Sequence, residues 1–162
     1  MDFFDLHCDT AYEMYVKNQD FENNTLAVSA KLGERFENWI QTFAIWINET
    51  QENPFLFYKN AISHLKKKLC GKVNPIFAVE GGSVIENDID RLYELKNDGI
   101  KILTLTWNGE NLIAGGTKSD KGLTDFGKSV IKEMNKIGMA VDVSHLNDKQ
   151  VQIIRDLVDN MN

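Results

Sequence analysis

Histidine and carboxylate side chains stand where three apolar stretches of the sequence end. His7 and Asp9 form an H-x-D motif after the first stretch, Glu80 closes the second and His145 closes the third. Residues i and i+2 of an extended chain point to the same face, so His7 and Asp9 can offer an imidazole and a carboxylate side by side. These donors suit zinc and related divalent metals. Taken singly, a turn-capping aspartate, an exposed glutamate and a core histidine are the competing interpretations.

Strands and helices alternate among the predicted elements that carry these side chains. The predicted strands are Met1–His7, Trp39–Ile47, Pro75–Glu80, Ile100–Trp107 and Met139–His145. The predicted helices are Ser29–Asn38, Pro54–Leu69, a segment from Asn87 or Asp88 to about Asn97, Thr124–Ile137, and a last helix that Asn147 and Gln150 begin like a capping box. This alternation, with strands that are almost continuously apolar, indicates a parallel sheet covered by helices.

Two α/β architectures fit this order of elements. One is a small doubly wound sheet, which the length of 162 residues favours. The other is five-eighths of a (β/α)8 barrel, whose usual size is about 250 residues. In both, the carboxyl ends of the strands face one crevice, so His7, Asp9, Glu80 and His145 are expected to converge there. Their convergence favours the barrel and a zinc site, which polarises a carbonyl and lowers the pKa of bound water to about 7.

Composition and charge argue against several other classes of protein. The chain holds 18 Lys plus Arg against 24 Asp plus Glu, a net charge of −6, which disfavours a nucleic-acid-binding module. No apolar run approaches the ~20 residues of a membrane span. The segment Met1–Thr10 lacks the basic start of a signal peptide, and Cys8 and Cys70 are too few for a disulfide scaffold. We therefore expect a cytoplasmic protein.

Three further features have weaker chemical interpretations. Trp107 ends the fourth predicted strand and is expected to line the same crevice. Gly81 and Gly82 follow Glu80 and would let the backbone come close to a ligand. His64 lies beside a run of lysines and is predicted to be a solvated helix residue.

Three stretches of the sequence resemble the membrane (renal) dipeptidase family. They are D-L-H-C-D-T near the start, V-E-G-G in the middle, and G-L-T-D-F-G-K-S-V-I-K-E-M-N-K-I-G-M-A-V-D-V-S-H at 122–145, the most specific of the three. Their order and spacing agree with the family over essentially the whole chain, and L-T-L-T-W-N-G-E-N fits its bacterial members. The resemblance implies a TIM-like (β/α)8 metallohydrolase barrel. Residues 1–162 would form a single domain, the N-terminal portion of the barrel with about five of the eight β/α units.

The same resemblance implies roles for individual residues. His7 and Asp9 would bind a first zinc ion and His145 a second, while Glu80 would bridge both as the central catalytic carboxylate. A water or hydroxide held between the two metals would attack the peptide carbonyl of a dipeptide substrate. Family members often accept a D-residue at the C-terminal position of that dipeptide.

The sequence departs from the family in two respects. Trp107 stands where some members have a substrate-contacting histidine, and together with Asn111 it is the implied substrate contact. Family members are also considerably longer. Their additional half would supply a second histidine for the second zinc, an acidic residue that handles the proton and an arginine that holds the substrate carboxylate. No histidine follows His145 in this chain.

Five strands cannot close a barrel, so open edges at the first and last strand predict self-association. Two other functions stay open on the sequence. One is a different metal-dependent barrel amidohydrolase, for example one acting on a cyclic amide. The other is a non-catalytic remnant or binding module that keeps some metal ligands.

Overall fold

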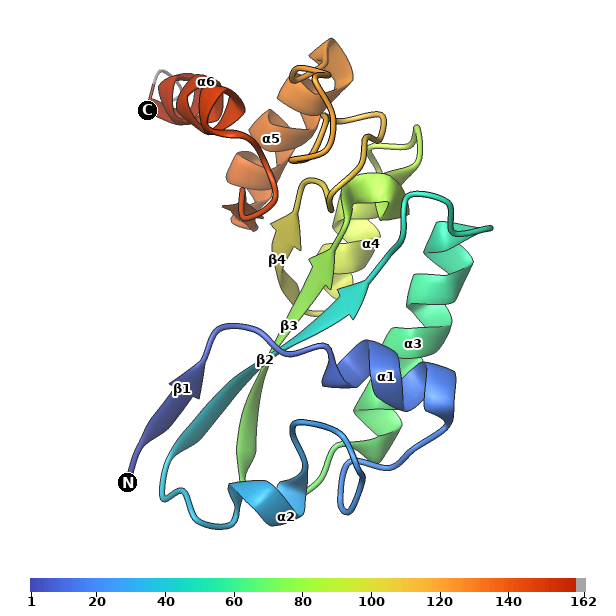
Figure 1. Ribbon diagram of the computed structural model, residues 1–162, viewed down its shortest axis with the longest axis vertical. Helices are drawn as coiled ribbons and strands as arrows, with labels where there is room; N and C mark the ends of the chain where they lie inside the picture. Colours follow the sequence, from blue (N-terminus) through green and yellow to red (C-terminus); the bar gives the residue numbers. More distant parts are fainter. Residues whose placement is uncertain (160–162) are drawn as a thin grey trace.

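A parallel sheet with helices packed along it forms the structure, a computed structural model that describes residues 1–159 (Figure 1). Its strands are β1 (Phe3–Asp5), β2 (Trp39–Trp46), β3 (Val73–Glu80), β4 (Ile100–Thr104) and β5 (Ala140–Asp142). Its helices are α1 (Thr10–Lys17), α2 (Ala30–Gly33), α3 (Pro54–Lys68), the short 3-10 helix η1 (Gly82–Ile85), α4 (Arg91–Asn97), α5 (Asp125–Ile137) and α6 (Asp148–Asp159). All five predicted strands are therefore confirmed.

The order of the strands decides between the two predicted architectures. The strands follow one another as β1-β2-β3-β4-β5, and each neighbouring pair is parallel. In Figure 1, β1 to β4 succeed one another across a curved sheet. A doubly wound sheet reverses its strand order at a switch point, whereas a barrel adds strands in one direction. The doubly wound alternative is wrong, and the strands form part of the wall of a TIM-like barrel.

One face of the sheet is buried against helices. Phe43 and Ile45 of β2 belong to the same buried apolar cluster as Tyr58, Ile62 and Leu65 of α3. These three α3 residues are spaced by four and three positions, which places them on one side of the helix. Helix α1 packs beside α3 (Figure 1). The apolar spacing that predicts the helix is thus the spacing that holds it on the sheet.

The opposite face is open to solvent along β1 and at the start of β2. Phe4 pairs in register with Ile40, and Leu6 follows two residues after Phe4. Phe4, Ile40 and Leu6 are 56%, 38% and 67% exposed, respectively. Because successive strand residues alternate between faces, the Phe4 and Ile40 side chains point away from the face that contains Phe43, and Leu6 lies just past the end of β1. An apolar strip therefore remains uncovered in the part of the chain that the structure describes.

Helix boundaries differ most from prediction near the N-terminus. No sequence signal assigned α1, and α2 is much shorter than the predicted helix Ser29–Asn38. The chain turns after α2 because Phe36 N donates to Gly33 O at 3.0 Å, and the Phe36 ring stacks on Phe3 with ring centroids 4.4 Å apart. Tertiary stacking on β1 therefore overrides local helix propensity. No helix within residues 1–159 combines the length and apolarity that crossing a bilayer requires.

The last two helices begin with side-chain caps that the sequence predicts. Thr124 Oγ1 accepts a first-turn backbone N–H of α5 at 2.9 Å, and Gly138 ends α5 in the left-handed conformation with φ 66°. At α6, Asn147 Oδ1 accepts from Gln150 N at 3.2 Å. The Gln150 side chain does not reach back, because its Nε2 donates to Lys121 O at 2.6 Å. Only half of the predicted capping box therefore forms.

We expect Thr124→Ala to lower the free energy of unfolding by about 1 kcal/mol, since it removes the α5 cap. The same hydroxyl lies 2.7 Å from Leu112 O, so the change also releases a loop contact. Ser129→Ala, on the exposed side of α5, is the matched control and should change stability by less than about 0.5 kcal/mol. Urea denaturation measures both variants, and equal effects would contradict a capping role.

Candidate metal centre

Backbone pairing of Cys8 places His7 and Asp9 on the same side of the chain. Cys8 N donates to Thr42 O and Cys8 O accepts from Ala44 N, both at 3.0 Å, so pairing with β2 continues past the end of β1. The Cys8 side chain is buried, and burial raises the pKa of its thiol to about 11. His7 Nε2 lies 3.3 Å from Asp9 Oδ1. The expected side-by-side imidazole and carboxylate are therefore present.

Glu80 ends β3 in a nearly closed environment. It is 7% exposed, and its backbone oxygen accepts from Ile47 N at 2.8 Å. Gly81 has φ 116°, and a Cβ there would lie 2.4 Å from Ile47 O. A Cβ on Gly82 would lie 2.4 Å from Leu105 O. The two glycines thus allow close approach of the neighbouring backbones at Ile47 and Leu105, and their approach to a ligand stays a prediction.

The Glu80 carboxylate lies between two imidazoles from distant parts of the sequence. Oε2 is 3.6 Å from His7 Nε2, and Oε1 is 2.7 Å from His145 Nε2. One donor atom each from His7, Asp9 and Glu80 fall within 4.8 Å of one another. His145 stands outside this group but contacts Glu80 directly. The structure therefore brings together all four side chains that the sequence singles out at three strand ends.

Burial and neighbouring charges shift the pKa values of this cluster in opposite directions. Burial raises the pKa of the Glu80 carboxyl, because the ionised form loses hydration. The hydrogen bond with Asp9 raises the pKa of His7, and the same bond lowers the pKa of Asp9. A desolvated carboxylate beside two imidazoles is a donor set that a divalent cation satisfies electrostatically. The residues present fit such an ion.

Aromatic rings form one wall beside the cluster. The Trp46 and Trp107 ring centroids are 5.0 Å apart, and Trp46 and Tyr12 are 5.1 Å apart, both in edge-on contact. A cavity of about 280 Å³ lies between this wall and the carboxylates of Asp9 and Glu80. Trp107 thus lines the crevice as the sequence predicts, although it follows β4 in a loop. Its role as a substrate contact stays a prediction.

Comparison with known proteins identifies the family. Residues 34–158 match the family described as membrane dipeptidase (peptidase family M19). The chain belongs to this family. The matched segment spans well over half of the chain and includes Glu80 and His145, whereas His7 and Asp9 precede it. The resemblance expected from the sequence is confirmed.

Relatives and solved structures of the membrane dipeptidase family resemble the chain over part of their own length. Dipeptidase verJ of Clonostachys rogersoniana is 39% identical over 79 residues, which cover 46% of this chain and 20% of that protein. A solved metallopeptidase of Rhodobacter sphaeroides, liganded with a phosphinate mimic of the dipeptide L-Ala-D-Ala, is 17% identical with a TM-score of 0.84. That likeness covers 97% of this chain and 62% of the solved one. The dipeptidase AC, an M19 metallopeptidase, is 19% identical with a TM-score of 0.65 over 74% of this chain and 49% of its own.

These comparisons establish the fold and the family of the chain. The solved structures are less than 25% identical to this chain, so their similarity shows only that the fold is TIM-like. The chain spans less than two-thirds of the length of each of these relatives.

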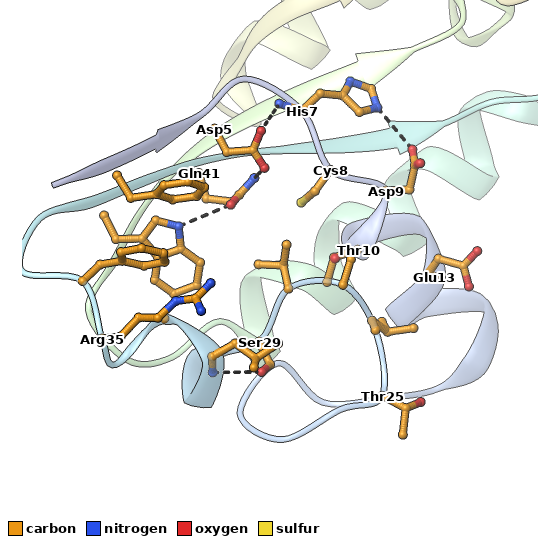
Figure 2. Close-up of a pocket in the computed structure, with 18 of the residues that line it drawn as sticks. Asp5, His7, Cys8, Asp9, Thr10, Glu13, Thr25, Ser29, Arg35 and Gln41 are labelled. Atoms are coloured by element: carbon orange, nitrogen blue, oxygen red, sulfur yellow. Dashed lines mark hydrogen bonds and ion pairs between the residues drawn. The ribbon is translucent and has the colours of Figure 1, made fainter. Parts of the chain in front are cut away.

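A second and larger cavity reaches His7 and Asp9 from the side of β1. Its volume is about 680 Å³, and it lies between β1, α1 and the segment that includes α2. Figure 2 shows Asp5, His7 and Asp9 along one side of this cavity, with Ser29 and Arg35 on the other. Glu80 lines the smaller cavity instead, so of the two cavities only the smaller one is lined by His7, Asp9 and Glu80 together.

Asn111 holds the loop after β4 rather than the cluster. Its Oδ1 accepts from Ile113 N and Ala114 N at 2.8 and 3.0 Å, and its Nδ2 donates to Leu105 O at 2.8 Å. These bonds engage both ends of the amide. These hydrogen bonds stabilise the loop, and a substrate contact through Asn111 stays a prediction.

The sequence analysis did not place Tyr12, Trp46 or Asn108 beside the cluster, and it predicted the wrong environment for His64. Tyr12 and Trp46 form the aromatic wall, and Asn108 hydrogen-bonds His145 at 3.2 Å. The signal for Asn108 was its place directly after a predicted strand end. His64, predicted to be solvated, is half-buried with Nε2 3.2 Å from Gln19 O. That bond joins α3 to the chain beyond α1, which no local pattern indicates.

We expect Glu80→Gln to weaken zinc binding more than tenfold, an order of magnitude typical for lost interactions at a metal site. The metal-free variant should be as stable as wild type or more so. A buried carboxyl whose pKa is raised destabilises the folded state at pH values above its titration range, and the neutral amide removes that cost.

Calorimetric zinc titration and urea denaturation in EDTA at pH 8 measure these two effects. Glu52→Gln, an exposed carboxylate elsewhere, is the matched control and should leave both unchanged. Unchanged zinc affinity in Glu80→Gln would contradict the assignment of Glu80 to the metal site.

Proposed function

We propose that this chain is the N-terminal part of a zinc-dependent dipeptidase, which hydrolyses the peptide bond of dipeptides. Membership of the membrane dipeptidase family supports the reaction class. The observation that carries the proposal is the position of Glu80, whose two carboxylate oxygens face His7 on one side and His145 on the other. A carboxylate with this arrangement can bridge two ions.

The proposal gives each side of the bridging carboxylate its own ligands. His7 and Asp9, together with Glu80 Oε2, would hold one zinc ion. His145, together with Glu80 Oε1, would hold the second. When bound, zinc lowers the pKa of a water to about 7 and polarises a carbonyl, which supplies the chemistry of hydrolysis without a serine or cysteine nucleophile.

The remaining residues shape where a substrate can lie. Tyr12, Trp46 and Trp107 line one side of the 280 Å³ cavity. Small dipeptides suit a cavity of this size. The phosphinate mimic of L-Ala-D-Ala held by the Rhodobacter sphaeroides metallopeptidase supports a C-terminal D-residue.

Hydrolysis of a panel of dipeptides, L-Ala-D-Ala and L-Ala-L-Ala among them, tests the proposal. We expect turnover that chelation abolishes, added zinc restores and Glu80→Gln eliminates. Hydrolysis of cyclic amides without dipeptides would favour a different amidohydrolase. Neither bound zinc nor turnover would favour a non-catalytic module.

We also propose that the chain self-associates through its open apolar strip. Phe4 on the edge strand β1, Ile40 on its neighbour β2 and Leu6 just past the end of β1 all expose their side chains. A second copy that covers this face would remove apolar surface from water. Sedimentation velocity should show a dimer or larger species that Leu6→Glu shifts to monomer. Leu56→Glu, equally exposed on α3, is the control, and a monomeric wild-type chain would contradict the proposal.

A further inference from the structure

Both ring nitrogens of His145 face oxygen atoms. Nε2 lies 2.7 Å from Glu80 Oε1, and Nδ1 lies 3.2 Å from Asn108 Oδ1. Both oxygens accept hydrogen bonds, so without a metal the ring can donate a proton toward either of them. A metal on Nε2 would take the lone pair of that nitrogen and leave the proton on Nδ1, where the Asn108 amide oxygen accepts it.

Asn108 is itself held in place by the loop that follows it. Its Oδ1 is 3.3 Å from Thr117 Oγ1, and its backbone oxygen accepts from Lys118 N at 2.8 Å. Gly116 packs so tightly here that a Cβ would lie 1.9 Å from Trp107 O. The amide oxygen therefore has a fixed position, set by contacts within one loop and not by His145 alone.

The residue before Asn108 restrains the same imidazole in a different way. The Trp107 ring lies 6.4 Å from the His145 ring, centroid to centroid, and is backed by Trp46. Ring packing limits how the imidazole tilts, while a hydrogen bond at Nδ1 limits how it rotates about its own axis. Two adjacent residues of one loop thus fix two different motions of His145.

We propose that Asn108 is the positioning residue of the metal centre, which sets the tautomer and rotation of His145 so that Nε2 faces Glu80. Partners of this kind orient metal-binding histidines and strengthen their hold on the ion. The inference rests on the proposed function in one respect, namely that His145 binds a metal. The hydrogen bond itself does not depend on that proposal.

Asn108→Ala tests the proposal, with Asn108→Asp as the conservative variant and Asn135→Ala, an exposed asparagine on α5, as the matched control. Calorimetric titration of the intact chain with zinc should show affinity at the His145 side about 10- to 100-fold weaker in Asn108→Ala. Asn108→Asp, which keeps an acceptor oxygen, should bind zinc within a few-fold of wild type. Asn135→Ala should bind as wild type does.

Nitrogen-15 NMR of the imidazole gives a second readout that a merely structural role would not move. The Nδ1 signal of His145, assigned with His145→Gln, should shift in Asn108→Ala and stay close to wild type in Asn108→Asp. Thr117→Val, which removes only the hydroxyl next to Asn108 Oδ1, should shift it in the same direction by less. This variant also covers the case in which Asn108→Ala fails to fold.

The outcomes separate the two proposals. Unchanged zinc affinity and an unchanged Nδ1 signal in Asn108→Ala would overturn the positioning role. Equal losses in Asn108→Ala and Asn135→Ala would also overturn it. If the wild-type chain binds no zinc, the proposed function fails, while the Nδ1 signal of the metal-free variants still decides whether Asn108 orients His145.

Discussion

Burial of the Glu80 carboxylate is the constraint on which the rest of the site depends. An ionised carboxylate at the end of an apolar strand loses hydration, and burial raises its pKa accordingly. The chain offsets this cost with an imidazole on each carboxylate oxygen, His7 on one side and His145 on the other. Neither imidazole is near Glu80 in the sequence. The fold must therefore bring two other strand ends to the end of β3, and a divalent cation between these donors would complete the compensation.

The parallel sheet brings these ends together through its register. Strand β2 lies between β1 and β3, and its pairing with the segment through Cys8 carries His7 and Asp9 up to the level of Glu80. On the other side, Glu80 pairs in register with Thr104, and Thr104 with Asp142. Thr104 Oγ1 donates to the Asp142 carboxylate at 2.6 Å. Burial raises the pKa of the Asp142 carboxyl, but the hydrogen bonds from Ser144 and Thr104 outweigh it and lower the pKa below its usual value. Asp142 is therefore a second carboxylate near the site, and its hydrogen bonds favour the ionised form.

The loop after β4 supplies what the strands cannot. Strands fix where a backbone ends, but the direction of the His145 ring depends on side chains that meet it from elsewhere. Asn111 organises the loop through its amide, and Asn108 presents its own amide oxygen to His145. The Trp107 ring, in the same loop, contacts the rings of both Trp46 and His145. Polar side chains that stabilise an irregular segment thereby also contact the candidate metal site.

The sequence by itself determined the features that depend on neighbouring residues. Strand alternation, the apolar face of α3, the Thr124 cap and the Gly138 stop are local patterns, and they predicted the five strands and the ends of α5. The pairing of His7 with Asp9 also followed from local geometry, because alternate residues of an extended chain share a face. Only the tertiary structure decided the strand order that excludes a doubly wound sheet, the use of Gly81 to approach Ile47, and the link from Asn108 to His145. The physical reason is separation along the chain: Glu80 and His145 are 65 positions apart, and a contact of that range depends on how all the intervening elements pack.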